Sequence, residues 1–218
     1  MGQHTTQLNT LAGGIVTQRA FPFMAPSEPA LLIGLVGRRQ SGKDTVASVA
    51  RELDDSVIRL GFGDPVKAEV AEALEVTLEY LDAHKEQLRP LVQAWGTEWR
   101  RNLCAEDYWL RRMSERIAAA PEDSIVIITD VRFENEADYI RGRGGVVVAL
   151  DVDNSFKRDD PVDQHPSETG SDTIKADYRI WNDQRTRAQL QIEVDEMLKW
   201  ASEQKQEATP PQSAALAN

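Results

Sequence analysis

Cysteine is nearly absent from this chain, because Cys104 is the only one among 218 residues. One cysteine cannot close a disulfide within the chain. The sequence therefore excludes a disulfide-stabilised secreted domain and favours a reducing cytosol. No local motif frames Cys104 as a nucleophile, so we expect a buried or half-buried small apolar side chain at this position.

Positive charge is also scarce, since 25 lysines and arginines stand against 36 acidic residues and the formal net charge is −11. Duplex nucleic acid and membrane surfaces attract basic proteins, so this balance argues against both classes of partner. No apolar run approaches the length of a membrane span, and the chain does not open with a basic segment followed by an apolar core. We expect a small ligand and a cytoplasmic location.

Regular periodicity is missing from both ends and from one internal stretch. Residues 1–29 and 203–218 have the composition of a disordered extension and a disordered tail. The residues between them, 30–202, are enough for one domain with a sizeable core. Within that domain, residues 153–170 are rich in charge and turn formers over a length that favours a functional lid. Its available cations are Lys157 and Arg158.

The stretch at 31–45, LLIGLVGRRQSGKDT, carries the strongest functional signal. An apolar run is followed by two glycines at the spacing of the loop that holds polyphosphate between a strand and a helix. Glycine suits both positions because the backbone must curl around the phosphates. The loop amides and the next helix N-terminus then form an anion site, which the lysine side chain completes. We assign nucleotide binding to Gly37, Ser41, Gly42, Lys43, Asp44 and Thr45.

One position departs from the usual form of this loop. Asp44 stands where a serine or threonine ordinarily contacts Mg²⁺, and the hydroxyl comes one place later at Thr45. We therefore expect phosphates and water to hold most of the metal, with Thr45 and Asp130 as indirect ligands.

The rest of the chain alternates between apolar runs and helix-compatible segments. Strands are predicted at 31–36, 57–62, 124–129, 146–152 and 178–181. This alternation predicts an α/β domain with a mostly parallel sheet of about five strands covered by helices on both faces. Asp64 is expected to cap the helix that Pro65 begins. Ligands in such sheets bind at the carboxyl ends of the strands, where Lys43 and Asp130 would meet.

Further candidate residues lie outside the loop. Asp130 closes a buried strand near the expected Mg²⁺, although it could instead cap the next helix. Arg132 could bind a phosphate with two parallel hydrogen bonds, and Arg100 could neutralise a second anion. Trp99 is a candidate for ligand contact, but a core position is the more common role for a tryptophan at helical spacing. Glu168 could hold a substrate hydroxyl or an arginine.

The chain resembles the deoxynucleoside monophosphate kinases of tailed bacteriophages, which are P-loop kinases. The resemblance covers residues from about 31 to 200. It rests on GLVGRRQSGKDT at 34–45, LVQAWGTEWRR at 91–101, EDYW at 106–109, IITDVRFENEADYIRGRGG at 127–145, HPSE at 165–168 and ADYRIWN at 176–182. The phosphate loop is shared with many kinases, whereas the order and spacing of TEWRR, TDVRFENE and HPSE are more selective.

The resemblance implies a three-layer P-loop kinase fold and reversible transfer of the ATP γ-phosphoryl group to a deoxynucleoside 5′-monophosphate, with Mg²⁺. In that picture the catalytic residues are Lys43, Asp130 and Arg132. Arg100 and Arg132 hold the acceptor phosphate, Trp99 and Glu168 contribute to acceptor binding, and the lid closes over the reactants. A phage-encoded enzyme would work in the host cytoplasm.

Three alternatives stay open from the sequence. The loop and the HPSE segment also resemble P-loop phosphomevalonate kinase and dephospho-coenzyme A kinase. A nucleotide-dependent switch would bind ATP with little acceptor-dependent turnover. A polynucleotide 5′ kinase is disfavoured by the acidic charge. The sequence leaves both a monomer and a homodimer open.

Overall fold

The computed structural model describes residues 28–151, 165, 169–181 and 186–208. Its centre is a five-stranded sheet in the order β2-β3-β1-β4-β5, in which every neighbouring pair is parallel. The strands are β1 (Leu31–Val36), β2 (Val57–Leu60), β3 (Ile125–Ile128), β4 (Val146–Asp151) and β5 (Tyr178–Trp181).

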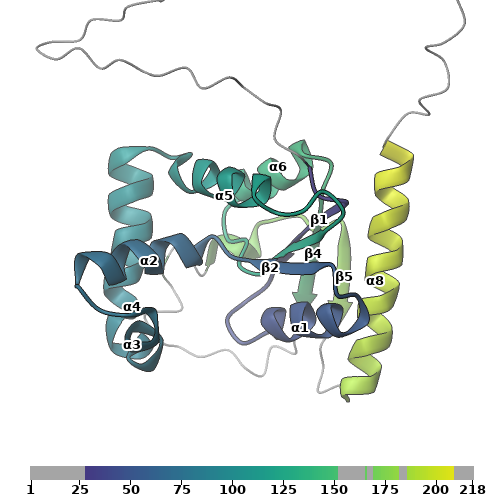
Figure 1. Ribbon diagram of the computed structural model, residues 1–218, viewed down its shortest axis with the longest axis horizontal. Coiled ribbons are helices and arrows are strands. Elements are labelled where there is room, and N and C mark those ends of the chain that lie inside the picture. The colour runs from purple at the N-terminus through teal and green to yellow at the C-terminus, as the bar shows by residue number, and fades with distance from the viewer. Residues whose placement is uncertain (1–27, 152–164, 166–168, 182–185, 209–218) are drawn as a thin grey trace, which may run out of the picture.

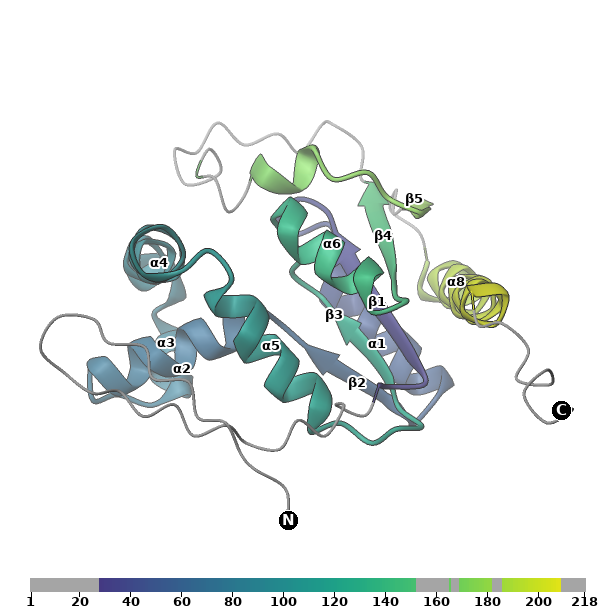
Figure 2. The same ribbon diagram turned by 90° about the horizontal axis from the view of Figure 1, so that it is seen from above.

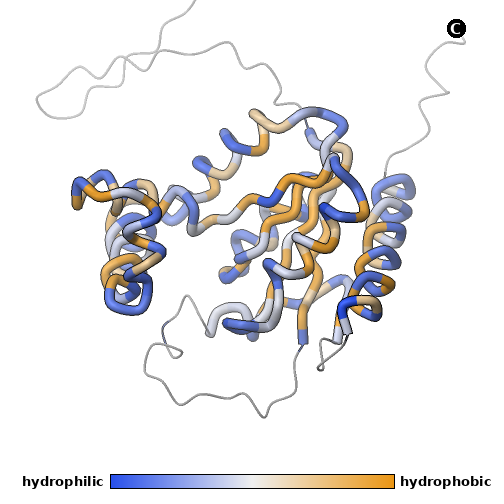
Figure 3. Tube along the Cα trace, turned by 60° about the horizontal axis from the view of Figure 1, so that its bottom comes forward, coloured by the Kyte–Doolittle hydropathy of each residue, from blue (hydrophilic) through white to orange (hydrophobic). Residues whose placement is uncertain are grey.

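The central strand β1 shows why these residues form a parallel sheet. All six of its residues are buried, because the strand lies between β3 and β4 and is covered on both faces. A strand with two buried faces needs a continuous apolar run rather than an alternating one. Figure 3 shows the sheet as the mostly apolar centre of the molecule.

Helices cover both faces of the sheet, as Figures 1 and 2 show. On one face, α1 (Lys43–Leu53) and α8 (Arg187–Ala208) pack in a cluster that includes Ile33 and Leu35. On the other face, α5 (Tyr108–Ala118) and α6 (Glu134–Gly142) pack in a cluster that includes Leu32 and Val36. Successive residues of β1 thus point to opposite layers, as the strand geometry requires.

A group of helices stands beside this three-layer core (Figure 1). It contains α2 (Gly63–Ala73), α3 (Leu78–Ala83), α4 (Lys85–Gln93) and the π-helix η1 (Ala94–Cys104). A small apolar cluster centred on Val70, Ala71 and Leu81 joins these helices to one another. A short 3₁₀ turn, η4 (Gly170–Asp172), precedes β5. The helical group forms one wall of the cavity described below.

The predicted α/β architecture with a parallel sheet of five strands is confirmed. The predicted lid lies mostly outside the described residues, as do Lys157, Arg158 and Glu168. No helix in the described parts of the chain has the length and apolar character needed to cross a membrane.

Some local expectations differ from the structure. The last helix continues to Ala208, so the predicted tail that starts at residue 203 begins inside it. The helix α2 begins at Gly63 after an N-cap at Phe62, so the expectation that Asp64 is the cap was wrong. Cys104 is exposed rather than buried, because it lies at the end of η1 at the surface.

Candidate active site

The loop between β1 and α1 has a backbone that favours glycine at its two ends. Gly37 and Gly42 have φ angles of 149° and 96°, values that side chains disfavour. A Cβ atom on Gly37 would also lie 2.7 Å from the Leu150 carbonyl oxygen and 2.8 Å from the Ser41 hydroxyl oxygen. Gly42 is the N-cap of α1 and provides no side-chain cap. The first amides of α1 are therefore available to an anion.

The side chain of Lys43 folds back onto this loop. Its Nζ donates hydrogen bonds to the carbonyl oxygens of Gly37 and Arg38, both at 2.6 Å, and to the hydroxyl of Ser41 at 3.2 Å. Lys43 and Asp44 also line the adjoining cavity. Thr45 is exposed and is not among the cavity-lining residues. The structure thus brings the lysine to the loop, whereas the threonine stands outside the cavity.

Asp130 follows β3 and faces the junction between β2 and α2. Its two carboxylate oxygens accept hydrogen bonds from the backbone amides of Phe62 at 2.7 Å and Gly63 at 2.8 Å. Burial raises the pKa of the Asp130 carboxyl above its usual range, although both amides and the charge of Arg132 act in the opposite direction. Asp130 and Arg132 line the same cavity as Lys43. The chain thus brings together three predicted catalytic residues that are widely separated in sequence.

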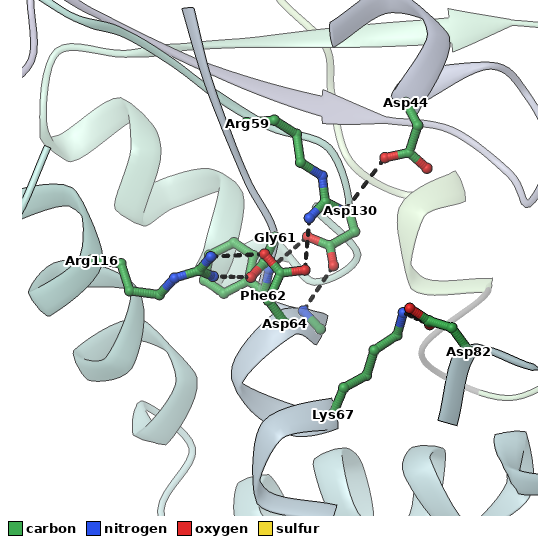
Figure 4. A network of polar contacts seen from close by, with 10 residues as sticks. Asp44, Arg59, Gly61, Phe62, Asp64, Lys67, Asp82, Arg116 and Asp130 are labelled. Atoms are coloured by element: carbon green, nitrogen blue, oxygen red, sulfur yellow. Dashed lines mark hydrogen bonds and ion pairs between the residues drawn. The ribbon is translucent and has the colours of Figure 1, made fainter. Parts of the chain in front are cut away.

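A polar network next to Asp130 links β2, α2 and α5 (Figure 4). Asp64 accepts hydrogen bonds from Arg59 at 2.7 Å and from Arg116 at 2.8 Å, and Arg116 also donates to the Gly61 carbonyl oxygen at 2.6 Å. Burial alone would raise the pKa of Asp64, but the hydrogen bonds from the two arginines outweigh it and hold the pKa below its usual value. Arg59 also lies 3.4 Å from Asp44, at the start of α1. The network therefore connects the α2 region to the phosphate loop.

A buried ion pair joins η1 to α6. The Arg101 guanidinium donates to Glu136 and, at 3.0 Å, to the side-chain oxygen of Asn135. Glu136 also accepts hydrogen bonds from the backbone amides of Arg132 at 2.8 Å and Phe133 at 3.2 Å. Burial raises the pKa of the Glu136 carboxyl to about 7, although the charge of Arg101 lowers it. One carboxylate thus fixes both an arginine of η1 and the backbone of Arg132.

These elements enclose a cavity of about 410 Å³, within the size range of small-molecule sites. Its lining contains apolar side chains of α2, α3 and α4, and cations and anions at the strand ends. The charged lining residues are Arg39, Lys43, Asp44, Arg59, Asp64, Lys67, Lys85, Arg89, Arg101, Asp130, Arg132 and Glu136. The mixture fits a ligand that has both a strongly charged end and a less polar body.

Two residues predicted to bind substrate lie away from this cavity. Arg100 donates from its Nε to Glu69 at 2.7 Å and lies over the rings of Trp95 and Tyr108. Trp99 stacks on Trp95 and is 56% exposed. Neither Arg100 nor Trp99 is among the lining residues.

The cavity contains residues that sequence reasoning missed. Arg101, directly after Arg100, is one of them, and Arg59, Arg89 and Gln93 are others. A repeat of four residues through Arg89, Gln93, Thr97 and Arg101 was a usable signal, since it places these side chains on one helical face. No such local pattern marked Arg59.

Metal-binding clusters were sought among the described residues. No group of three or more His, Cys, Asp or Glu side chains there could hold a metal ion. His165 instead contacts Glu98 at 2.9 Å. Any cation at this site would therefore need additional oxygen ligands from a substrate or from water.

The sequence comparisons with known proteins all match this chain to kinases. The family model described as phosphomevalonate kinase matches residues 35–144. A protein of Acanthamoeba polyphaga mimivirus, provisionally named a deoxynucleotide monophosphate kinase, is 30% identical over 174 residues, which cover 67% of this chain and 84% of that protein. The deoxynucleoside-5′-monophosphate kinase of Escherichia phage T5 is 36% identical over 89 residues, which cover 38% of this chain and 34% of that protein.

Solved structures of shikimate kinases show a weaker likeness. The enzyme from Aquifex aeolicus vf5 has a TM-score of 0.45 and 17% identity, and the one from Bacteroides thetaiotaomicron has a TM-score of 0.41 and 18% identity. Each alignment covers 78% of this chain and 97% of the other. The sheet order and the phosphate loop of this chain define its fold.

Proposed function

This chain is a phosphotransferase of the deoxynucleotide monophosphate kinase family of P-loop kinases, and we propose that it transfers the γ-phosphoryl group of ATP to a deoxynucleoside 5′-monophosphate. The products are ADP and the deoxynucleoside diphosphate. One observation carries the proposal: the phosphate loop opens into the same cavity as Asp130, Arg132 and Arg101. A donor and an acceptor can therefore meet at one place.

The donor side is formed by the loop at residues 37–45. The amides at the start of α1 and the positive end of its dipole would hold the ATP phosphates. Lys43 would exchange its hydrogen bonds with loop carbonyl oxygens for bonds to the β and γ oxygens, and would neutralise charge as the phosphoryl group moves.

The residues present fit Mg²⁺ only as a partly protein-bound ion. The carboxylates of Asp44 and Asp130 are oxygen ligands of the kind that Mg²⁺ prefers, and both line the cavity. Asp130 already accepts two backbone hydrogen bonds, so it would act best through bound water. A Mg²⁺ ion held there would supply charge neutralisation. Thr45 would contribute only indirectly, from outside the cavity.

The acceptor side lies between η1 and the end of β3. Arg132 would bind the acceptor phosphate, and Arg101 would take the place that the sequence assigned to Arg100. Lys157, Arg158 and Glu168 would join the site when the lid segment closes, excluding water and preventing ATP hydrolysis. In-line transfer needs no covalent enzyme intermediate, so positioning and charge are the main requirements.

Phosphomevalonate is the second candidate acceptor, because the matching family model carries that name. It is also a phosphate monoester, so the phosphate-binding arginines do not separate it from a nucleotide. The distinction depends on the far end of the cavity. There a nucleotide needs a base pocket, whereas phosphomevalonate needs a cation for its carboxylate.

The proposal is tested by measuring ADP release from ATP and Mg²⁺ with dTMP, dGMP, dCMP, dAMP, the ribonucleotides, phosphomevalonate, dephospho-coenzyme A and no acceptor. We expect turnover with deoxynucleotides. Turnover with a non-nucleotide acceptor alone would show that the proposed substrate is wrong and that the proposed phosphoryl transfer is right. ATP binding without any acceptor-dependent turnover would favour the switch.

A further inference from the structure

Polar side chains of the cavity recur at every fourth residue along α4 and η1. They are Lys85, Arg89, Gln93, Thr97 and Arg101, and all five line the cavity. Residues four apart lie on one side of a helix. We call this set the polar ladder. It presents one continuous hydrogen-bonding face to the cavity.

The polar ladder becomes more buried toward the strand ends. Lys85 is exposed, Arg89 and Gln93 are half-buried, and Thr97 and Arg101 are only 6% and 7% exposed. The ladder therefore runs from solvent into the interior. Its buried end, at Arg101, is joined through Glu136 to the backbone of Arg132. That end is the one near the phosphoryl-transfer residues.

The outer face of the same helical stretch is mixed in character. Leu91, Trp99 and Leu103 are 40%, 56% and 79% exposed, and they lie among exposed polar side chains such as Glu98. Helices on the surface of a globular protein ordinarily bury the apolar face and expose the polar one. In this stretch Leu88, Val92 and Trp95 pack against the apolar cluster of the helical group. Core packing by these residues does not explain the polar side chains that line the cavity beside them, whereas a polar ligand does.

The polar ladder contains buried donor atoms without a hydrogen-bond partner among the described residues. The side-chain nitrogen Nε2 of Gln93 and the Nε of Arg101 are among them. Buried donors are nearly always paired in folded proteins, and leaving one unpaired destabilises the structure. Both atoms belong to cavity-lining residues. A ligand that supplies acceptors to both would complete the site.

The two donors are separated along one face of the cavity. Gln93 is the last residue of α4, and Arg101 lies eight residues later in the π-helix η1, roughly two helical turns away. One end of a ligand can therefore meet Arg101 while its other end meets Gln93. Gln93 is also uncharged, which suits a base edge better than a second anionic group.

We propose that Gln93 determines base specificity by hydrogen bonding to the edge of the acceptor base, while Arg101 Nε donates to the acceptor phosphate. The inference rests on the proposed function, because it takes the acceptor to be a deoxynucleotide. A glutamine amide offers one acceptor and two donors, so it can pair with a base edge that presents both kinds of group.

The decisive variant is Gln93→Glu, which keeps the size of the side chain but leaves only acceptors when ionised. The cytosine edge has an exocyclic amino group, whereas the thymine edge has two carbonyl oxygens beside its single N–H group. We expect the ratio of kcat/KM for dCMP to that for dTMP to rise about tenfold, a change that corresponds to one hydrogen bond of differential strength. Gln87→Glu is the matched control, because Gln87 is exposed on α4 and does not line the cavity.

A second variant, Gln93→Ala, keeps the inference testable if the glutamate is poorly tolerated. It should raise the KM for dCMP and dTMP about tenfold while leaving the KM for ATP unchanged. Circular dichroism and thermal melting would show that each variant is folded. If the ratio of kcat/KM for dCMP to that for dTMP is unchanged in Gln93→Glu, the assignment is overturned. If the glutamate variant does not fold, an unchanged acceptor KM in Gln93→Ala overturns it.

The failure of this inference differs from the failure of the proposed function. If the unaltered protein does not phosphorylate deoxynucleotides, the proposed function fails and Gln93 loses its role with it. If the unaltered protein phosphorylates them and the Gln93 variants keep its base preference, only the inference is overturned.

Discussion

The two halves of the cavity are built in different ways. The phosphate loop is formed by consecutive residues, and Lys43 donates hydrogen bonds to Gly37, Arg38 and Ser41, which lie within six residues of it. On the acceptor side, Arg101 contacts Glu136, 35 residues away. The comparison shows that the phosphate loop is encoded locally, whereas the proposed acceptor site depends on packing between η1, α6 and the end of β3.

The two halves also differ in how their charges are held. The loop uses backbone amides and one flexible lysine, so its geometry follows from backbone angles. The proposed acceptor side uses carboxylates that fix arginines, since the buried Glu136 fixes Arg101 and the half-buried Asp64 fixes Arg59 and Arg116. Changes in the loop should therefore affect chemistry, whereas changes on the acceptor side should affect binding and stability together.

The largest effect is expected from Lys43→Ala. Removing the cation that follows the migrating phosphoryl group should lower kcat about 10³-fold while the fold remains intact. Steady-state ADP release and circular dichroism would measure the two properties. Lys199→Ala, on the exposed side of α8, is a suitable control. A rate within tenfold of the unaltered protein would remove the loop lysine from the mechanism.

The next largest effect is expected on the acceptor KM, and it should distinguish Arg101 from its neighbour Arg100. Arg101→Lys should raise the acceptor KM about tenfold, because a lysine keeps the charge but loses the planar donor group. Arg100→Lys should change the acceptor KM less than about twofold, since Arg100 is bonded to Glu69 outside the cavity. Steady-state kinetics on both variants measures the contrast. The opposite ranking would restore Arg100 as the acceptor ligand.

The third effect concerns stability as a function of pH. The folded-state pKa of Glu136 is raised from 4.5 to about 7, so the folded state binds more protons between these values. The contribution of Glu136 to stability is present below pH 4.5 and is lost as the pH rises through about 7. The charged groups around it are Arg101, Arg132 and Asp130.

Chemical denaturation from pH 4.5 to 8 should show this dependence. Glu136→Gln should reduce the change in unfolding free energy between pH 4.5 and 8 by up to about 3 kcal/mol. This value is the free-energy equivalent of the pKa difference. Glu134→Gln removes an exposed carboxylate from the same helical turn and is the matched control. Parallel curves for the Glu136 variant and the unaltered protein would contradict the assignment.

The smallest effect is expected at the surface of η1. Trp99→Ala should change the acceptor KM less than about twofold, because Trp99 lies outside the cavity and is 56% exposed. Its loss of stacking on Trp95 should cost about 0.5–1 kcal/mol of unfolding free energy. Kinetics and thermal melting give the two values. A large rise in KM would instead place the tryptophan against the acceptor, as first expected.

The sequence predicted those parts of the site that depend on neighbouring residues. The glycine spacing located the phosphate loop, and the apolar runs located the strands whose ends carry Lys43 and Asp130. It also predicted Arg132, because this residue follows a buried strand. The prediction from sequence chose Arg100 rather than Arg101, although the repeat of four residues that begins at Arg89 reaches Arg101. The helix η1 places Arg101 in the lining of the cavity and Arg100 outside it.

By itself, then, the sequence determined the alternation of strands and helices and the conformation of the phosphate loop. Apolar runs must be buried, and backbone angles such as those of Gly37 and Gly42 strongly favour glycine. Only the tertiary structure decided that Asp64 pairs with Arg116, that Glu136 holds Arg101, and that the polar ladder faces the cavity beside the sheet. These contacts join elements far apart in the chain, so they form only when the helices pack beside the sheet.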